Sequence, residues 1–214
     1  MRENQTDVDH EVCLFPDVDD ARNIVDRMFN SNPAIAEQIK RLLDAAEALD
    51  KAPRHLSEEK INKLREAVDQ AAYAANKMMT MEALSKAGIE LVEVEYSGSG
   101  DEGSIDDVQY SPERPPQGFS FPAMGVEVEW SRDRRRDSIE SISVFEGHIN
   151  EDSLTEDADE AVEQAGFGGY QDNDGGGGKV FFHVKAEGQY PAGSIVVQHY
   201  FNVLHEEQQD AVVF

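Results

Sequence analysis

The spacing of apolar residues changes at Gly88. Before this glycine, apolar residues recur at intervals of three, four and seven, which predicts two amphipathic helices joined by a short turn at "KAPRHLS". After it, apolar and polar residues alternate, as in "IELVEVEY" and "GVEVEW", which is the pattern of half-buried β-strands. We therefore predict an α+β fold in which an N-terminal α-helical hairpin precedes a mostly antiparallel β-sheet with one short helix.

This pattern divides the chain into three segments. We predict an acidic flexible arm at residues 1–20, the helical hairpin at residues 21–87 and an acidic α+β domain at residues 88–214. In the last segment, "SLTEDADEAVEQA" predicts the short helix, with Ser153 as its N-cap. Three stretches rich in glycine, proline or serine are predicted to be loops: "YSGSGDEGSIDD", "YSPERPPQGFSFPAMG" and "GFGGYQDNDGGGG". Strands and helices do not alternate along the chain, so a dinucleotide-binding fold is not expected.

The acidic residues are unevenly distributed. The formal net charge of the chain is −25, of which residues 1–20 carry −6, residues 21–87 carry +1 and residues 88–214 carry −20. Adaptation to high salt would place acidic residues along the whole chain, and residues 21–87 do not show this. A surface as negative as that of residues 88–214 repels nucleic acid and anionic lipid and attracts basic proteins.

The sequence also bears on where the protein acts. No apolar run reaches the roughly 18 residues needed to cross a bilayer, and the start "MRENQTDVDHEV" lacks the basic and apolar regions of a signal peptide. The single cysteine, Cys13, cannot form an internal disulfide, which fits a reducing compartment. We expect a cytoplasmic protein that does not contact membranes.

Two strands carry pairs of glutamates on one face. Glu93 and Glu95 share a face of one predicted strand, and Glu127 and Glu129 share a face of another. Residues two apart on a strand are separated by about 6.5 Å, which is close to twice the rise of about 3.4 Å per phosphate along one DNA strand. If the two strands were neighbours, these carboxylates would form a row that imitates a phosphate backbone; the alternative is an ordinary solvated strand face.

The first glycine-rich loop, "YSGSGDEGSIDD", has three readings. Its backbone N–H groups could line an anion site, but its carboxylates would repel a phosphate and no Gly-Lys-Ser/Thr motif is present. Cation binding is chemically better, although the spacing departs from that of a calcium loop. The third reading is a structural turn with an acidic rim. The candidate residues of this loop are Ser97, Gly98, Ser99 and Gly100, and its acids are Asp101, Glu102, Asp106 and Asp107.

The second glycine-rich loop, "GGYQDNDGGGGKVFF", begins like a calcium loop and then lacks the later acids, so hairpin geometry is a sufficient explanation. Its candidate residues are Asn173, Asp174, Gly175 and Gly176. If the two loops converged, Asp101, Asp174 and His199 could bind a metal or act as acid and base. His199 lies on the apolar face of its predicted strand and His183 on the opposite face of the neighbouring strand, positions that core histidines often occupy.

The combination of "VEYSGSGDEGSIDDV" with "NDGGGGKVFFHV" and the closing strand "IVVQHYFNVL" resembles an uncharacterised small α+β domain family of bacteria, phages and mobile elements. That family carries paired "YSGSGDxG" and "NDGGxG" loops, and the resemblance covers about residues 60–210. The matching positions here are Ser97–Gly103 and Asn173–Gly176, with Glu102 where a serine is usual. The resemblance implies a single domain and a phage or mobile-element setting. It implies no activity, so no catalytic residue is carried over.

We expect a non-enzymatic acidic protein that inhibits a nucleic-acid-binding host defence protein by occupying its basic groove as a DNA mimic. The expected partner is a basic protein rather than nucleic acid, and no cofactor, metal or catalytic residue is predicted. A homodimer through the helical hairpin and a role as a subunit of a larger complex are left open. The alternative function is a metal- or small-molecule-dependent enzyme with a pocket between the two loops. The predicted interaction residues are Glu93, Glu95, Asp101, Glu102, Asp106, Asp107, Glu127 and Glu129.

Overall fold

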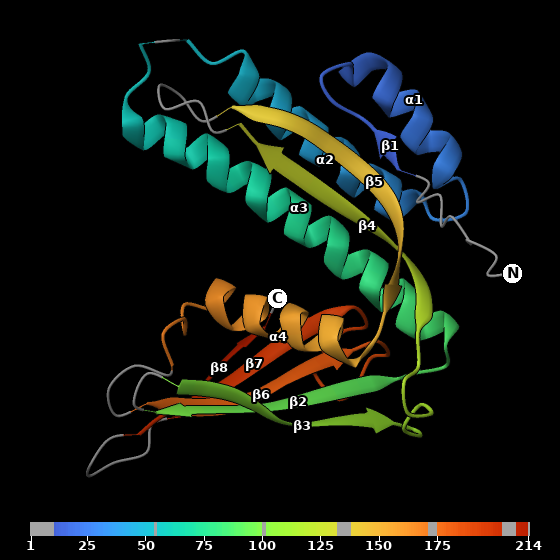
Figure 1. The fold of residues 1–214 in the computed structure, drawn as a ribbon, viewed down its shortest axis with the longest axis vertical. Coiled ribbons are helices and arrows are strands. Elements are labelled where there is room, and N and C mark those ends of the chain that lie inside the picture. Colours follow the sequence, from blue (N-terminus) through green and yellow to red (C-terminus); the bar gives the residue numbers. More distant parts are fainter. Residues whose placement is uncertain are drawn as a thin grey trace, which may run out of the picture. The chain divides into compact units, whose positions relative to one another are not determined.

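The structure, a computed structural model, describes residues 11–53, 55–99, 102–131, 138–170 and 175–202 and the backbone of residues 209–213. The chain forms two compact units, each built from two separate stretches of sequence (Figure 1). Unit 1 comprises Met1–Met79 and Ala123–Gly147, and unit 2 comprises Thr80–Pro122 and His148–Phe214. Helices and antiparallel strands are both present, which confirms the predicted α+β class.

The helices of unit 1 are α1 (Val18–Met28), α2 (Pro33–Asp50) and the first part of α3 (Glu58–Lys86). The side chains of Asp17 and Asn32 cap α1 and α2 by accepting backbone N–H bonds, and Pro33 occupies the first turn of α2, where no N–H partner is lost. Because α1 precedes the two predicted helices and packs on α2, the predicted hairpin is matched only loosely. The apolar stripe of α2 lies in the core of unit 1: Ile35, Ala36, Ile39, Leu42, Leu43, Ala46 and Leu49.

The sheet of unit 1 has three strands in the order β1 (Val12–Cys13), β5 (Ile139–Ile149) and β4 (Phe121–Trp130). The side chain of Asn76 on α3 bonds to both the backbone N–H and the backbone C=O of Val126 on β4, at 2.7 and 2.9 Å. Within the predicted arm, Leu14 is buried and its N–H donates to the carbonyl of Ile142. The described end of that arm is therefore part of the fold.

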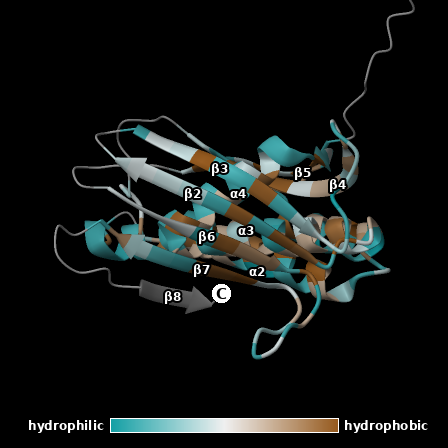
Figure 2. Ribbon diagram, turned by 90° about the horizontal axis from the view of Figure 1, so that it is seen from below, coloured by the Kyte–Doolittle hydropathy of each residue, from teal (hydrophilic) through white to brown (hydrophobic). Residues whose placement is uncertain are grey.

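Unit 2 contains a five-stranded antiparallel sheet with strand order β3-β2-β6-β7-β8. Its strands are β2 (Leu91–Ser99), β3 (Glu102–Ser111), β6 (Gly176–His183), β7 (Ser194–Phe201) and β8 (Gln209–Val213). Helix α4 (Glu151–Gln164) covers one face of this sheet (Figure 1), and Figure 2 shows the strands side by side from the opposite face. The core between α4 and the sheet includes Leu154, Ala158, Val92, Val94, Val180, Phe182, Ile195 and Val197.

Several predicted boundaries differ from the structure. The first glycine-rich stretch forms a β-hairpin rather than a loop, because β2 extends to Ser99 and β3 begins at Glu102. The second contributes Gly176, Gly177 and Gly178 to β6, where the neighbouring strands leave no room for a Cβ. Helix α4 is capped by Asn150, with Ser153 at the third helical position completing a capping box, so the predicted Ser153 cap was wrong by three residues.

The division into units also differs from the three predicted segments. Residues 123–147, expected in the acidic α+β domain, belong to unit 1. The reason is that β4 and β5 pair with β1 rather than with the strands of unit 2. Among the described residues, no helix is long and apolar enough to cross a membrane.

Candidate functional site

Most of the negative charge of the chain belongs to unit 2. The sequence of this unit holds 22 acidic and four basic side chains, a formal net charge of −18, whereas unit 1 holds 22 acidic and 15 basic side chains, a net charge of −7. Unit 2 therefore carries 18 of the 25 net negative charges of the chain.

Each lysine and arginine of unit 2 is described, and each forms an ion pair inside the unit. Lys86 pairs with Glu82, Arg114 with Glu151, Lys179 with Glu93 and Glu95, and Lys185 with Glu90. A phosphate ligand needs cations that are available to bind it. All four cations of unit 2 are engaged by glutamates of the same unit.

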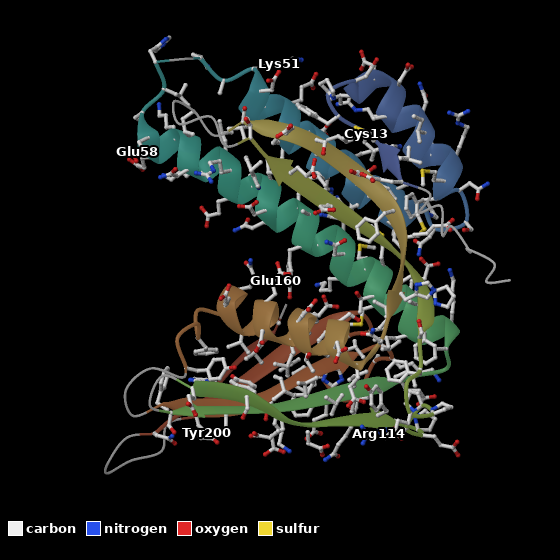
Figure 3. The ribbon with its side chains drawn as sticks, viewed as in Figure 1. Cys13, Lys51, Glu58, Arg114, Glu160 and Tyr200 are labelled. Carbon is white, nitrogen blue, oxygen red and sulfur yellow. The ribbon has the colours of Figure 1, made fainter. Side chains whose placement is uncertain are left out.

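Helix α4 presents a row of carboxylates on the side away from the sheet. Four of its five exposed acids recur every three or four residues, and Glu160 projects away from the sheet in Figure 3. Four residues of an α-helix span about 6 Å, so the carboxylates repeat at about that interval. We call this set the acidic row: Asp152, Glu156, Glu160 and Glu163.

The acidic row was not among the predicted interaction residues. Its signal is present in the sequence, since the acids of "EDSLTEDADEAVEQ" that fall opposite Leu154, Ala158 and Val162 follow the helical period. From the sequence, the phosphate-like row is expected on the strand glutamates, and this segment is predicted only to be a short helix.

The two predicted glutamate pairs do not form one ladder. Glu93 and Glu95 lie on β2 in the five-stranded sheet of unit 2, while Glu127 and Glu129 lie on β4 in the three-stranded sheet of unit 1. The strands are therefore not neighbours, as the phosphate-like row required. On the open face of the unit 2 sheet, Lys179 lies 2.5 Å from Glu93 and 3.5 Å from Glu95, and the hydrogen bond to Glu93 raises the pKa of Lys179.

The hairpin acids lie along the edge strand of the same sheet. Glu102, Asp106 and Asp107 belong to β3, and Asp107 is directly opposite Glu95 of β2. The strand register shifts at Asp106, whose carboxylate accepts a hydrogen bond from the Ser104 hydroxyl. These exposed carboxylates fit the predicted acidic rim. Asp101 and Gly100 lie outside the described residues.

The bases of the two glycine-rich loops come together. Gly98 pairs with Gly176 across β2 and β6, and Gly175 adopts a positive φ of 78°. A Cβ at Gly175 would lie 1.9 Å from the carbonyl oxygen of Gly98, and one at Gly176 would lie 2.9 Å from Cε1 of His199. The glycines thus permit close packing of backbone and ring. Ser97 and Ser99 flank Gly98 on β2, and Asn173 and Asp174 lie outside the described residues.

Behind these glycines lies a buried tyrosine–histidine pair. The hydroxyl of Tyr96 is 2.9 Å from Nδ1 of His199, and the two side chains are 1% exposed. The His199 ring stacks on Phe167 at 4.5 Å, and burial raises the pKa of Tyr96 above its ordinary value. This confirms the placement of His199 on the apolar face. Among the described residues, no cluster of three histidine, cysteine or acidic side chains could hold a metal ion.

Comparison with known proteins identifies one family. The model of a family of unknown function, DUF6878, matches residues 72–190. No curated protein and no solved structure matches the chain.

Proposed function

The chain belongs to the family of unknown function DUF6878, and we propose that it is a non-enzymatic protein that binds a basic, nucleic-acid-binding protein through the acidic surface of unit 2. The observation that carries this proposal is the net charge of −18 in a unit whose four cations are all paired internally. Such a surface steers basic grooves toward it and repels nucleic acid.

The acidic row on α4 supports a DNA-mimic mode of binding. Its interval of about 6 Å is close to twice the rise of about 3.4 Å per phosphate on one DNA strand, so a groove that holds successive phosphates can hold successive carboxylates. In this proposal the acidic row has the role that the sequence predicts for the glutamates of β2 and β4. The hairpin acids of β3 extend the negative surface to the edge of the sheet.

The proposed partner is a host defence protein such as a nuclease, inhibited in the cytoplasm when its DNA groove is occupied. This role fits a protein encoded by a phage or mobile element. A homodimer through α2 and α3 would present two copies of the acidic row, and light scattering of the purified protein measures whether it forms.

Displacement from DNA tests the proposal. Host lysate is loaded on immobilised duplex DNA and eluted with increasing concentrations of the purified protein at low salt. We expect specific DNA-binding proteins to be released in complex with the chain, and the complexes to dissociate as salt rises, because both attraction and steering are electrostatic. Failure to release any protein, with the chain itself not retained on DNA, would contradict the proposal.

A second candidate function is a metal- or small-molecule-dependent enzyme at the converging loop bases. The pairing of Gly98 with Gly176 favours it, because it brings the two predicted loops to the same end of the sheet. This candidate requires a stoichiometric metal or ligand in the purified protein, lost in Asp101→Ala or Asp174→Ala. Elemental analysis and mass spectrometry of the native protein test this, and a protein purified without either would exclude it.

A further inference from the structure

Two large hydrophobic side chains of the described residues are exposed, and they are neighbours at the end of β7. Tyr200 is 36% exposed and Phe201 is 42% exposed. Successive strand residues point to opposite faces of a sheet, so the two rings lie on opposite sides. Tyr200 lies over Gly177 on the face away from α4 (Figure 3), and Phe201 lies on the α4 side with His199.

Phe201 borders a small aromatic surface. Its ring centroid lies 4.4 Å from that of His199 and 6.2 Å from that of Phe167, and both ring pairs are arranged edge to face. Phe167 is itself half-buried and stacks on His199. Phe201 therefore packs on His199 and Phe167 on one side and is open to solvent on the other. Aromatic side chains that anchor a binding partner are often placed in this way.

Two carboxylates of α4 lie beside the segment that follows Phe167. Glu163, in the last turn of α4, lies beside Gly168, the residue after Phe167. Asp159 accepts a hydrogen bond from the Tyr170 hydroxyl two residues further on, at 3.4 Å. The cations of unit 2 are all engaged with glutamates elsewhere. Glu163 and Asp159 thus contact the segment that follows Phe167, the ring next to Phe201, and the four cations of unit 2 pair with other glutamates.

Unit 2 already contains such an arrangement with its own arginine. The guanidinium of Arg114 lies 6.0 Å from the centroid of the Tyr110 ring, and the same group bonds to Glu151 at 3.0 Å. An aromatic ring and a carboxylate therefore hold an arginine in this unit. At Phe201 the ring is exposed and Glu163 lies beside the adjoining Phe167–Gly168 segment, but the four cations of unit 2 pair with other glutamates.

We propose that Phe201 is the contact for an arginine side chain of the basic partner, whose guanidinium lies on the exposed ring and pairs with Glu163 at the C-terminal end of α4. This inference rests on the proposed function and adds to it the residue type that the partner supplies. Arginine is favoured over lysine because its planar guanidinium is more weakly hydrated, stacks on aromatic rings and binds a carboxylate through two parallel hydrogen bonds.

Two variants separate this contact from general charge attraction. Phe201→Leu keeps an apolar side chain and removes the aromatic face. Tyr200→Leu is the matched control, because it removes a comparably exposed ring from the neighbouring position, where Gly177 and Ser97 are the facing residues of β6 and β2. Thermal unfolding of both variants establishes that they remain folded.

The probes are a hexa-arginine and a hexa-lysine peptide, with binding measured by calorimetry at low salt. We expect Phe201→Leu to weaken binding of the arginine peptide by about three- to ten-fold, as loss of a cation–π contact predicts, and to leave the lysine peptide within about twofold. Tyr200→Leu should leave both unchanged. An equal effect of Phe201→Leu on both peptides, or no effect, overturns the arginine contact while the acidic-surface proposal stands. Binding of neither peptide by the wild-type protein overturns both.

Discussion

The hydroxyl of Tyr96 on β2 lies 2.9 Å from Nδ1 of His199 on β7, although the two strands are separated by β6. The bond crosses over Gly178 of β6, which lies between them in the strand register and has no side chain to obstruct it. The hydrogen bond therefore links β2 to β7 across the glycine-rich start of β6. We expect it to stabilise this end of the sheet.

Tyr96→Phe removes that hydroxyl and keeps the ring. We expect the free energy of unfolding to fall by about 1–2 kcal/mol, because the variant loses a buried hydrogen bond and leaves Nδ1 of His199 without it. Urea denaturation measures the change. Tyr170→Phe is the control, since its hydroxyl bonds to Asp159 at 3.4 Å from a half-buried ring and should contribute less than about 0.5 kcal/mol. Equal effects of the two variants would contradict a special role for the Tyr96–His199 bond.

Gly176→Ala tests the reason for the tetraglycine. A Cβ here would lie 2.9 Å from Cε1 of His199 and 2.7 Å from the carbonyl oxygen of Tyr200. We expect destabilisation of about 2–3 kcal/mol from the forced displacement of ring and backbone. Gly168→Ala is the matched control, because its nearest neighbour would be Cγ of Glu163 at an ordinary 3.5 Å. Should Gly176→Ala be tolerated as well as Gly168→Ala, the close-packing explanation of the glycines fails.

The sequence predicted the class of the fold correctly, but it did not predict which strands pair with one another. Alternation in "IELVEVEY" and "GVEVEW" correctly indicated strands, now β2 and β4. The same alternation in both could not show that they belong to different sheets, because strand pairing depends on contacts distant in sequence. β3 was missed because "EGSIDDV" is rich in residues that are rare in strands, and its place is fixed by pairing with β2.

The tetraglycine was predicted as a loop for a similar reason. Glycine lowers strand propensity, and the requirement for it at Gly176 comes from His199, which is 23 positions away in the chain. For the candidate site, the sequence showed the acidic character, and the interaction role that it assigned to the hairpin acids of β3 stays a prediction. The acidic row of α4 was readable from the helical period, whereas the pairing of Lys179 with Glu93 and Glu95 required the sheet register.

Asp157 of α4 makes the stability of unit 2 depend on pH. Burial raises the pKa of its carboxyl to about 6, the Thr80 hydroxyl bonded to it at 3.1 Å opposes the shift, and nearby Glu156 adds to it. The folded state therefore binds more protons than the unfolded state between pH values of about 4 and 6. Protonation of Asp157 therefore favours the folded state. The free energy of unfolding is highest with respect to this group below about pH 4, and it falls as the pH rises from about 4 to 6.

Asp157→Asn removes the titration and retains an acceptor for Thr80. We expect the variant to be more stable than the wild type by about 2 kcal/mol at neutral pH, with the difference shrinking toward pH 4, because asparagine carries no charge to bury. Denaturation across this pH range measures it, with the exposed Asp152→Asn as control. A difference that grows as the pH falls would contradict the assignment.

The central claim is that the position of negative charge on unit 2, and not the net charge of the chain, determines binding. Two variants with the same formal net charge of −21, four units from the wild-type −25, separate these possibilities. One removes the acidic row through Asp152→Asn, Glu156→Gln, Glu160→Gln and Glu163→Gln. The other removes four exposed acids of unit 1 through Glu37→Gln, Asp50→Asn, Glu58→Gln and Glu66→Gln.

The most direct measurement is the concentration of each protein that releases half of the displaced host proteins from immobilised DNA. The account predicts that the variant without the acidic row requires about tenfold more protein, corresponding to about 1.4 kcal/mol, whereas the unit 1 variant stays within about twofold of the wild type. Equal losses in the two variants would show that net charge alone is responsible, and would contradict the claim that α4 carries the binding surface.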